Sequence, residues 1–172
     1  MPKLDCYMSS CHTLCRYDWL DCINWVHQVG FSGVECFDEA KENFSTMTSE
    51  RALQLGARAK ELGIALSAHP WVNWADLPED EMIRQYLRVV DRCAEMGVKY
   101  LNMHLHFVSD RAQGMQRLFR ATVAFLPKLV DAGITLLYEN VPEYGKRELG
   151  SEVRDFEALF RYYPADMPVQ MN

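Results

Sequence analysis

Four glycines recur along the chain at nearly constant intervals, and each one follows a stretch with the pattern of an amphipathic helix. Gly30, Gly63, Gly97 and Gly133 are 33, 34 and 36 residues apart. A glycine just past the last helical residue commonly ends a helix, and the interval is about the length of one strand with its crossover helix. An apolar run follows each glycine, as expected for a strand. The repeat therefore predicts a βα protein with a parallel sheet.

The ionisable residues that end these apolar runs occupy equivalent positions in the repeat. They are Glu35, His69, His104 and Glu139, which follow their glycines by 5, 6, 7 and 6 residues. Parallel barrels and open α/β sheets bind ligands at the carboxyl ends of their strands. We therefore expect these four side chains to lie around one shared site.

Helical periodicity and capping residues give the limits of the predicted elements. The predicted helices cover residues 18–29, 48–62, 78–96, 111–132 and 148–162. Pro127 should kink the fourth of these helices or divide it in two. A first strand is expected from Leu4 to about Ser9, and residues 167–172 open a sixth strand. The chain therefore contains five complete βα units and the beginning of another.

The number of units determines the expected fold. A closed (β/α)₈ barrel takes roughly 200 to 250 residues or more. The 172 residues of this chain fit one domain, residues 1–172, but are too few for a closed barrel. Three explanations are open: further units are missing, a second chain covers the exposed strands, or the sheet is a smaller doubly wound one. We favour the first, a truncated or partial TIM barrel. Its exposed sheet edge predicts a homo-oligomer or other pairing through that edge.

Charge and hydropathy exclude several classes of partner. The net charge of −6 argues against broad attraction to nucleic acid or to anionic membranes. No apolar run approaches 18 residues, and the first residues lack the apolar core of a signal peptide. We therefore expect a cytoplasmic protein without a membrane span.

Four of the six cysteines crowd the first 22 residues. Cys6, Cys11, Cys15 and Cys22 have spacings that match no zinc-ribbon or ferredoxin pattern. A cytoplasmic location favours thiols over disulfides, and a free cysteine packs as a small apolar side chain. We interpret these cysteines as structural, with a metal cluster as the less favoured alternative.

His69, His104 and Glu139 form the candidate metal site. Two imidazoles and a carboxylate are ligand types that zinc, manganese and non-haem iron use, and neighbouring strand ends allow them to converge. Glu139 is the candidate catalytic residue, because a carboxylate ending an apolar strand is costly without a cation or hydrogen bonds. The structural alternative for each histidine is a hydrogen-bonded core residue.

Five further residues are candidates for substrate contact. His106 shares the strand parity of His104 and could bind substrate oxygens or orient a metal ligand. Glu35 could hold a sugar hydroxyl, orient an imidazole or form a loop salt bridge. Trp71 and Trp74 could form an apolar wall against a sugar face or simply cover the barrel mouth. Asn140, directly after Glu139, completes the set.

Four short motifs resemble those of a known family. They lie at Gly30–Glu35, Gly63–His69, Gly97–His104 and Leu137–Pro142. In order and spacing they resemble the xylose isomerase-like TIM barrels, a superfamily of sugar and sugar-phosphate isomerases and epimerases that also includes endonuclease IV of AP endonuclease family 2. The resemblance covers almost the whole chain.

The resemblance implies different roles in the two branches of that superfamily. In isomerases and epimerases, the residue matching Glu139 binds a divalent metal, usually Mn or Mg, and acts as an acid or base, while those matching His69 and His104 contact substrate. In the endonuclease branch all three are zinc ligands. The remaining ligands of the family, on strands six to eight, have no counterpart in this sequence. That branch continues its fourth strand His-Pro-Gly, whereas this chain has His104-Leu-His106.

The residues and the resemblance together indicate a metal-dependent isomerase or epimerase acting on a sugar or related polyol. A bound Mn, Mg or Zn would polarise a carbonyl and its neighbouring hydroxyl, and Glu139 or another carboxylate would move the proton. The alternatives are a zinc-dependent phosphodiester hydrolase and an inactive half-barrel that only associates.

Overall fold

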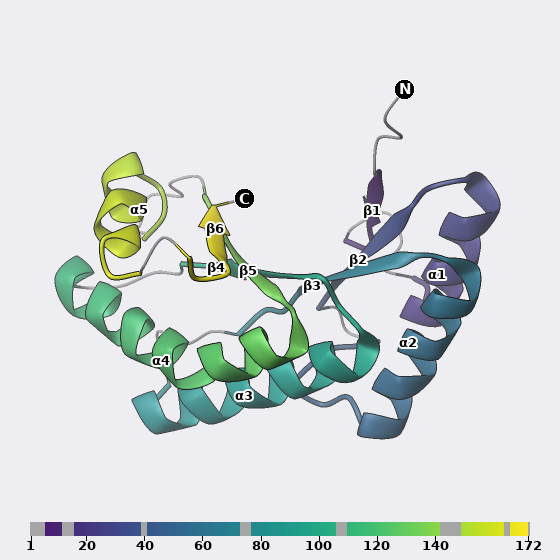
Figure 1. The fold of residues 1–172 in the computed structure, drawn as a ribbon, viewed down its shortest axis with the longest axis horizontal. Helices are drawn as coiled ribbons and strands as arrows, with labels where there is room; N and C mark the ends of the chain where they lie inside the picture. Colours follow the sequence, from purple (N-terminus) through teal and green to yellow (C-terminus); the bar gives the residue numbers. More distant parts are fainter. Residues whose placement is uncertain are drawn as a thin grey trace.

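The computed structural model describes residues 6–11, 16–38, 41–72, 77–105, 110–141, 149–163 and 166–171. Strands and helices alternate along these residues (Figure 1). The elements are β1 (Tyr7–Ser9), α1 (Trp19–Val29), β2 (Gly33–Phe37), α2 (Ser49–Leu62), β3 (Ala65–His69), α3 (Glu79–Met96), β4 (Tyr100–His104), α4 (Arg111–Ala132), β5 (Thr135–Glu139), α5 (Val153–Phe160) and β6 (Val169–Met171).

The strands form one parallel sheet whose order follows the chain, from β1 at one edge to β6 at the other. Figure 1 shows that the sheet is curved, with the helices on its outer side and an opening between β1 and β6. This is the arrangement of neighbouring staves in a TIM barrel. The prediction of a partial barrel with five βα units and a sixth strand is confirmed.

Local sequence signals explain where the helices begin and end. The four repeated glycines follow α1, α2, α3 and α4, with φ angles of 85°, 67°, 69° and 66°, a left-handed conformation that strains residues with a Cβ atom. Asp18 and Thr48 cap α1 and α2 by accepting hydrogen bonds from Asp21 N and Arg51 N. The predicted ends of the first four helices are therefore confirmed to within a residue.

Two details of the helices differ from expectation. Pro127 lies inside α4, which is one continuous helix, so the alternative of two short helices is wrong. Leu118, Phe125 and Leu129 bury the same helix on both sides of the proline, and this packing holds it together. The last helix, expected over 148–162, covers only Val153–Phe160, because Gly150 turns the chain with a φ of 87°.

Alternation along the strands separates the core from the site. Leu101 and Met103 of β4 are buried, and so are Leu136 and Tyr138 of β5; these side chains face the helices. Residues of opposite parity, including Asn102, face the concave side of the sheet. None of the described helices combines the length and apolar character needed to cross a membrane.

Candidate metal centre

The carboxyl ends of β3, β4 and β5 bring His69, His104 and Glu139 together. His104 and Glu139 are paired in the β4–β5 register, and His69 ends β3. His69 Nε2 lies 2.9 Å from His104 Nε2 and 3.1 Å from Glu139 Oε2, and His104 Nε2 lies 3.0 Å from the same oxygen. Two ring nitrogens and one carboxylate oxygen therefore face a common point.

Charge is strongly coupled within this group. Burial of the His69 ring opposes its protonation, but hydrogen bonds and charges from Glu139 and Glu35 outweigh burial and raise the pKa of His69 to about 9. Hydrogen bonds from His104 and His69 hold the pKa of Glu139 far below its usual value, against a smaller effect of burial. The raised pKa of His69 means that its ring can carry the positive charge that compensates the Glu139 carboxylate.

The same three atoms fit a divalent cation. Among the described residues, His69, His104 and Glu139 form a group that could hold a metal ion, because their ligand atoms lie within 4.8 Å of one another. Two N–H groups cannot point at each other across 2.9 Å, so at least one ring nitrogen directs its lone pair toward the other. Two imidazoles with one carboxylate suit zinc, iron or manganese better than magnesium, which prefers oxygen ligands.

Two polar side chains support the three. Glu35, on β2, places Oε1 3.1 Å from His69 Nδ1. Asn102, buried two residues before His104, donates from Nδ2 to Glu139 Oε2 at 3.0 Å. Asn102 was not predicted from the sequence, although it shares the strand parity of His104, which was a usable signal.

Aromatic rings lie beside the imidazoles. The half-exposed Trp71 ring is 5.0 Å from the His104 ring, centroid to centroid, at 85°. Asp38 accepts hydrogen bonds from the backbone N–H groups of Phe44 and Trp71 at 2.8 and 2.7 Å, and so ties the loop after β2 to the loop after β3. Asp38 was not predicted from the sequence either, because Trp71, one of its partners, lies on another loop 33 residues away.

The remaining candidates for substrate contact are Asn140, His106 and Trp74. Asn140 is exposed one residue beyond β5, and His106 and Trp74 lie outside the described residues. Of the five substrate candidates, the structure therefore brings Glu35 and Trp71 against the histidines.

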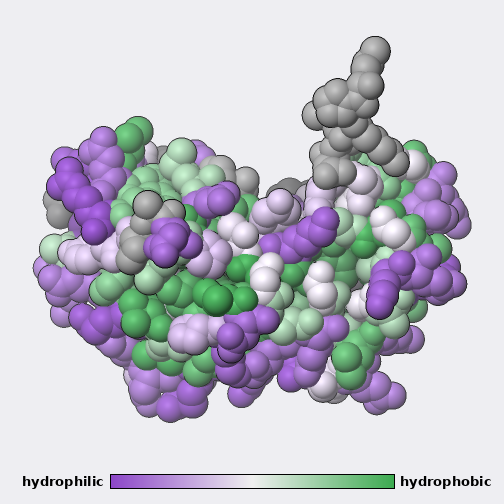
Figure 2. Space-filling model, in the orientation of Figure 1, coloured by the Kyte–Doolittle hydropathy of each residue, from purple (hydrophilic) through white to green (hydrophobic). Residues whose placement is uncertain are grey.

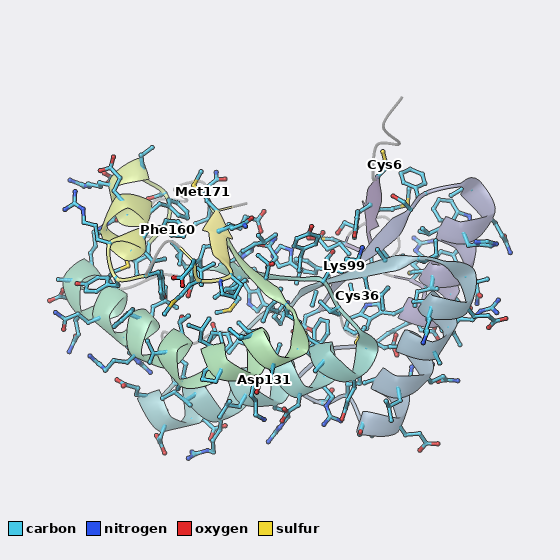
Figure 3. All side chains as sticks on the ribbon, viewed as in Figure 1. Cys6, Cys36, Lys99, Asp131, Phe160 and Met171 are labelled. Carbon is cyan, nitrogen blue, oxygen red and sulfur yellow. The ribbon has the colours of Figure 1, made fainter. Side chains whose placement is uncertain are left out.

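The concave face of the sheet is hollowed. A hollow of about 360 Å³ is lined by residues of β1 to β5 that include Ser9, Glu35, Ser67, Tyr100 and Asn102. Figure 2 shows a depression in the surface between the side of the molecule that contains α5 and the side that contains β1. Met171 and Cys6 lie on opposite sides of this opening (Figure 3). Glu35 and Asn102, which contact the candidate ligands, therefore line this hollow, and His104 and Glu139 are partly exposed while His69 is buried.

Parallel strands of a partial barrel, with ionisable groups at their carboxyl ends, are the arrangement of an enzyme-like TIM-barrel protein. The chain belongs to the xylose isomerase-like TIM barrel family, whose model matches residues 23–164. This finding confirms the resemblance seen in the four motifs. No curated protein sequence matches the chain.

Solved structures share the fold at low sequence identity. A D-psicose 3-epimerase determined in the presence of D-fructose has a TM-score of 0.78 and 13% identity, over 98% of this chain and 62% of that chain. The apo form of a 3-keto-D-glucoside 4-epimerase from E. coli has a TM-score of 0.74 and 14% identity, over 98% of this chain and 67% of that chain. AP endonuclease, family 2, from Brucella melitensis has a TM-score of 0.70 and 15% identity, over 100% of this chain and 68% of that chain. The chain therefore spans about two thirds of the length of these proteins.

Proposed function

We propose that the protein is a divalent-metal-dependent isomerase or epimerase acting on a sugar or a related polyol. The observation that supports it most directly is the convergence of His69 Nε2, His104 Nε2 and Glu139 Oε2 at the carboxyl ends of adjacent strands. Family membership and the epimerases among the similar folds add support. Its substrate, its cytoplasmic location and its self-association are predictions.

The side chains have distinct roles in this proposal. His69, His104 and Glu139 would hold the cation, which when bound polarises a sugar carbonyl and acidifies the neighbouring C–H group. Both histidines and Asn102 contact Oε2 of Glu139, so we assign Oε1 of this partly exposed carboxylate to proton transfer with substrate. Trp71 would cover one face of the sugar, beside His104.

The donor set also supports a second candidate, a zinc-dependent phosphodiester hydrolase. In that reaction the same three side chains would hold zinc, which would generate the attacking hydroxide, and the two Nε2 atoms are close enough for a shared ion. The net charge of −6 and the His104-Leu-His106 sequence argue against it. We therefore place it second.

A proton-exchange assay tests the first candidate. The chain, loaded with Mn²⁺, is incubated with a panel of ketoses in deuterated water, and products are examined for epimers and for deuterium at carbon. We expect incorporation with at least one sugar and its loss in Glu139→Gln. Glu95→Gln, near the C-terminal end of α3, is the matched control and should retain activity.

Metal analysis separates the candidates. One exchangeable Mn²⁺ with sugar turnover supports the isomerase, whereas tightly held zinc with cleavage of a phosphodiester supports the hydrolase. A chain that takes up no cation and turns over neither substrate would contradict both and leave a half-barrel that only associates.

A further inference from the structure

We infer that Glu35 is a positioning residue that keeps the proton of the His69 ring on Nδ1 and thereby makes Nε2 the atom that His69 offers to a cation. The inference rests on the metal site of the proposed function and adds a residue that acts through His69.

The contact between the two side chains defines the arrangement. Glu35 Oε1 lies 3.1 Å from His69 Nδ1, across neighbouring strands, and the His69 side chain is only 7% exposed. A carboxylate accepts hydrogen bonds and cannot donate them, so Nδ1 must carry the proton in this pair. In a neutral ring, Nε2 then bears the lone pair, and it points toward His104 and Glu139.

The opposite tautomer fits the surroundings poorly. It would require Nδ1 to accept from Asn102 Nδ2, which is 3.4 Å away and already donates to Glu139 Oε2 at 3.0 Å. The Nδ1 lone pair would then face the Glu35 carboxylate at the shorter distance of 3.1 Å. A charge-assisted hydrogen bond is stronger than a long neutral one, so the contact with Glu35 decides the tautomer.

Glu35 and the His69 ring are both held in place by neighbouring strands. Ser9 is the register partner of Glu35 on β1, and Phe37 is the partner of His69 on β2. The Phe37 ring packs 4.6 Å from the His69 ring at 67°, so the imidazole is confined beside its acceptor.

This geometry gives Glu35 a measurable effect on metal binding. A partner that accepts from the distal nitrogen of a ligating histidine fixes the ring and increases its basicity, and its loss typically lowers metal affinity by about 10- to 100-fold. Glu35→Ala should therefore weaken Zn²⁺ binding by roughly that factor. Glu35→Gln keeps an acceptor oxygen in the same place and should recover most of the affinity.

The experiment combines zinc titration with nitrogen NMR of the histidine rings. In the zinc-loaded chain we expect the His69 signals to show a proton on Nδ1 and zinc on Nε2, a pattern retained in Glu35→Gln and lost or averaged in Glu35→Ala. Glu95→Gln serves as the charge-matched control and should leave both affinity and ring signals unchanged. Circular dichroism establishes whether each variant is folded. If Glu35→Ala is not folded, the isosteric Glu35→Gln is compared with the unaltered chain in zinc affinity and in its His69 ring signals.

The outcomes separate this inference from the proposed function. Zinc bound through Nδ1 of His69, or equal zinc affinity in Glu35→Ala and the unaltered chain, would overturn the role of Glu35 and leave the metal site intact. The expected zinc and ring signals, without turnover of any sugar, would support the inference and contradict the isomerase. An unaltered chain that binds no zinc would contradict both the role of Glu35 and the metal site of the proposed function.

Discussion

Single protonation states at the site influence the stability of the metal-free chain. The pKa of His69 is raised to about 9, so its contribution is complete below the unfolded value of about 6.5 and is lost as the pH rises toward 9. The pKa of Glu139 is lowered, so its contribution is present above the unfolded value of about 4.3 and is lost as the pH falls. We expect the thermal midpoint, measured with a chelator, to be highest between about pH 4.5 and 6.5.

His69→Gln is the control for this pH dependence. It should flatten the decline between about pH 6.5 and 9, because glutamine does not titrate there. A chain that loses no stability over that interval, or a variant with the same decline, would contradict the assignment to His69.

Individual site residues were predictable to different degrees. His69, His104 and Glu139 could be found because each ends an apolar run at an equivalent position of the repeat. The strand parity of Asn102 placed it on the same face as His104, but its hydrogen bond to Glu139 depends on strand register, and Asp38 depends on a loop distant in sequence. Sequence periodicity thus predicts which side chains meet, whereas supporting hydrogen bonds require coordinates.

Packing between α2 and α3 depends on a glycine inside a helix. A Cβ atom at Gly56 would lie 2.8 Å from Met96 O and 2.9 Å from Glu95 O, both backbone atoms that cannot move aside locally. Gly56→Ala should therefore destabilise the fold by about 1–3 kcal/mol, although alanine is the better helix former. Denaturant unfolding measures the change.

The neighbouring exposed position provides the matched control. Ala57→Gly changes helix propensity without a close backbone contact and should cost roughly 0.5–1 kcal/mol. A stabilised Gly56→Ala variant would show that α2 and α3 can separate without penalty.

Elements with strong local signals were predictable, and the others were not. Caps at Asp18 and Thr48 and the repeated glycines determine helix limits through contacts within a few residues. The continuity of α4 through Pro127 depends on tertiary packing, which outweighs local preference. The turn at Gly150 is also tied to the fold, because its N–H donates to the buried Asp155 at 2.9 Å.

At the scale of the whole molecule, the sheet has an open edge at β6 as far as the structure describes it. Within the described sheet, β6 pairs with β5 on one side only, and Met171 is 59% exposed. An exposed strand edge favours pairing with another chain, and a charge there opposes it. We expect concentration-dependent self-association in sedimentation velocity, and Met171→Lys should reduce it.

Val153→Lys tests whether added charge alone has this effect. Val153 is 77% exposed on α5, away from the sheet, so its substitution should leave association unchanged. Equal reduction by both variants, or a monomer at every concentration, would argue against pairing through β6.

The three candidate ligands come from different strands, and successive ones are 35 residues apart in the chain. In an unfolded chain, binding of one ion by all three side chains would close two long loops, which costs chain entropy. A cation therefore selects the assembled strands, and its free concentration raises their stability by mass action. A slip of one residue between β4 and β5 would turn His104 or Glu139 toward the helices. Retention of the ion would thus report that the strands have paired in the correct alignment.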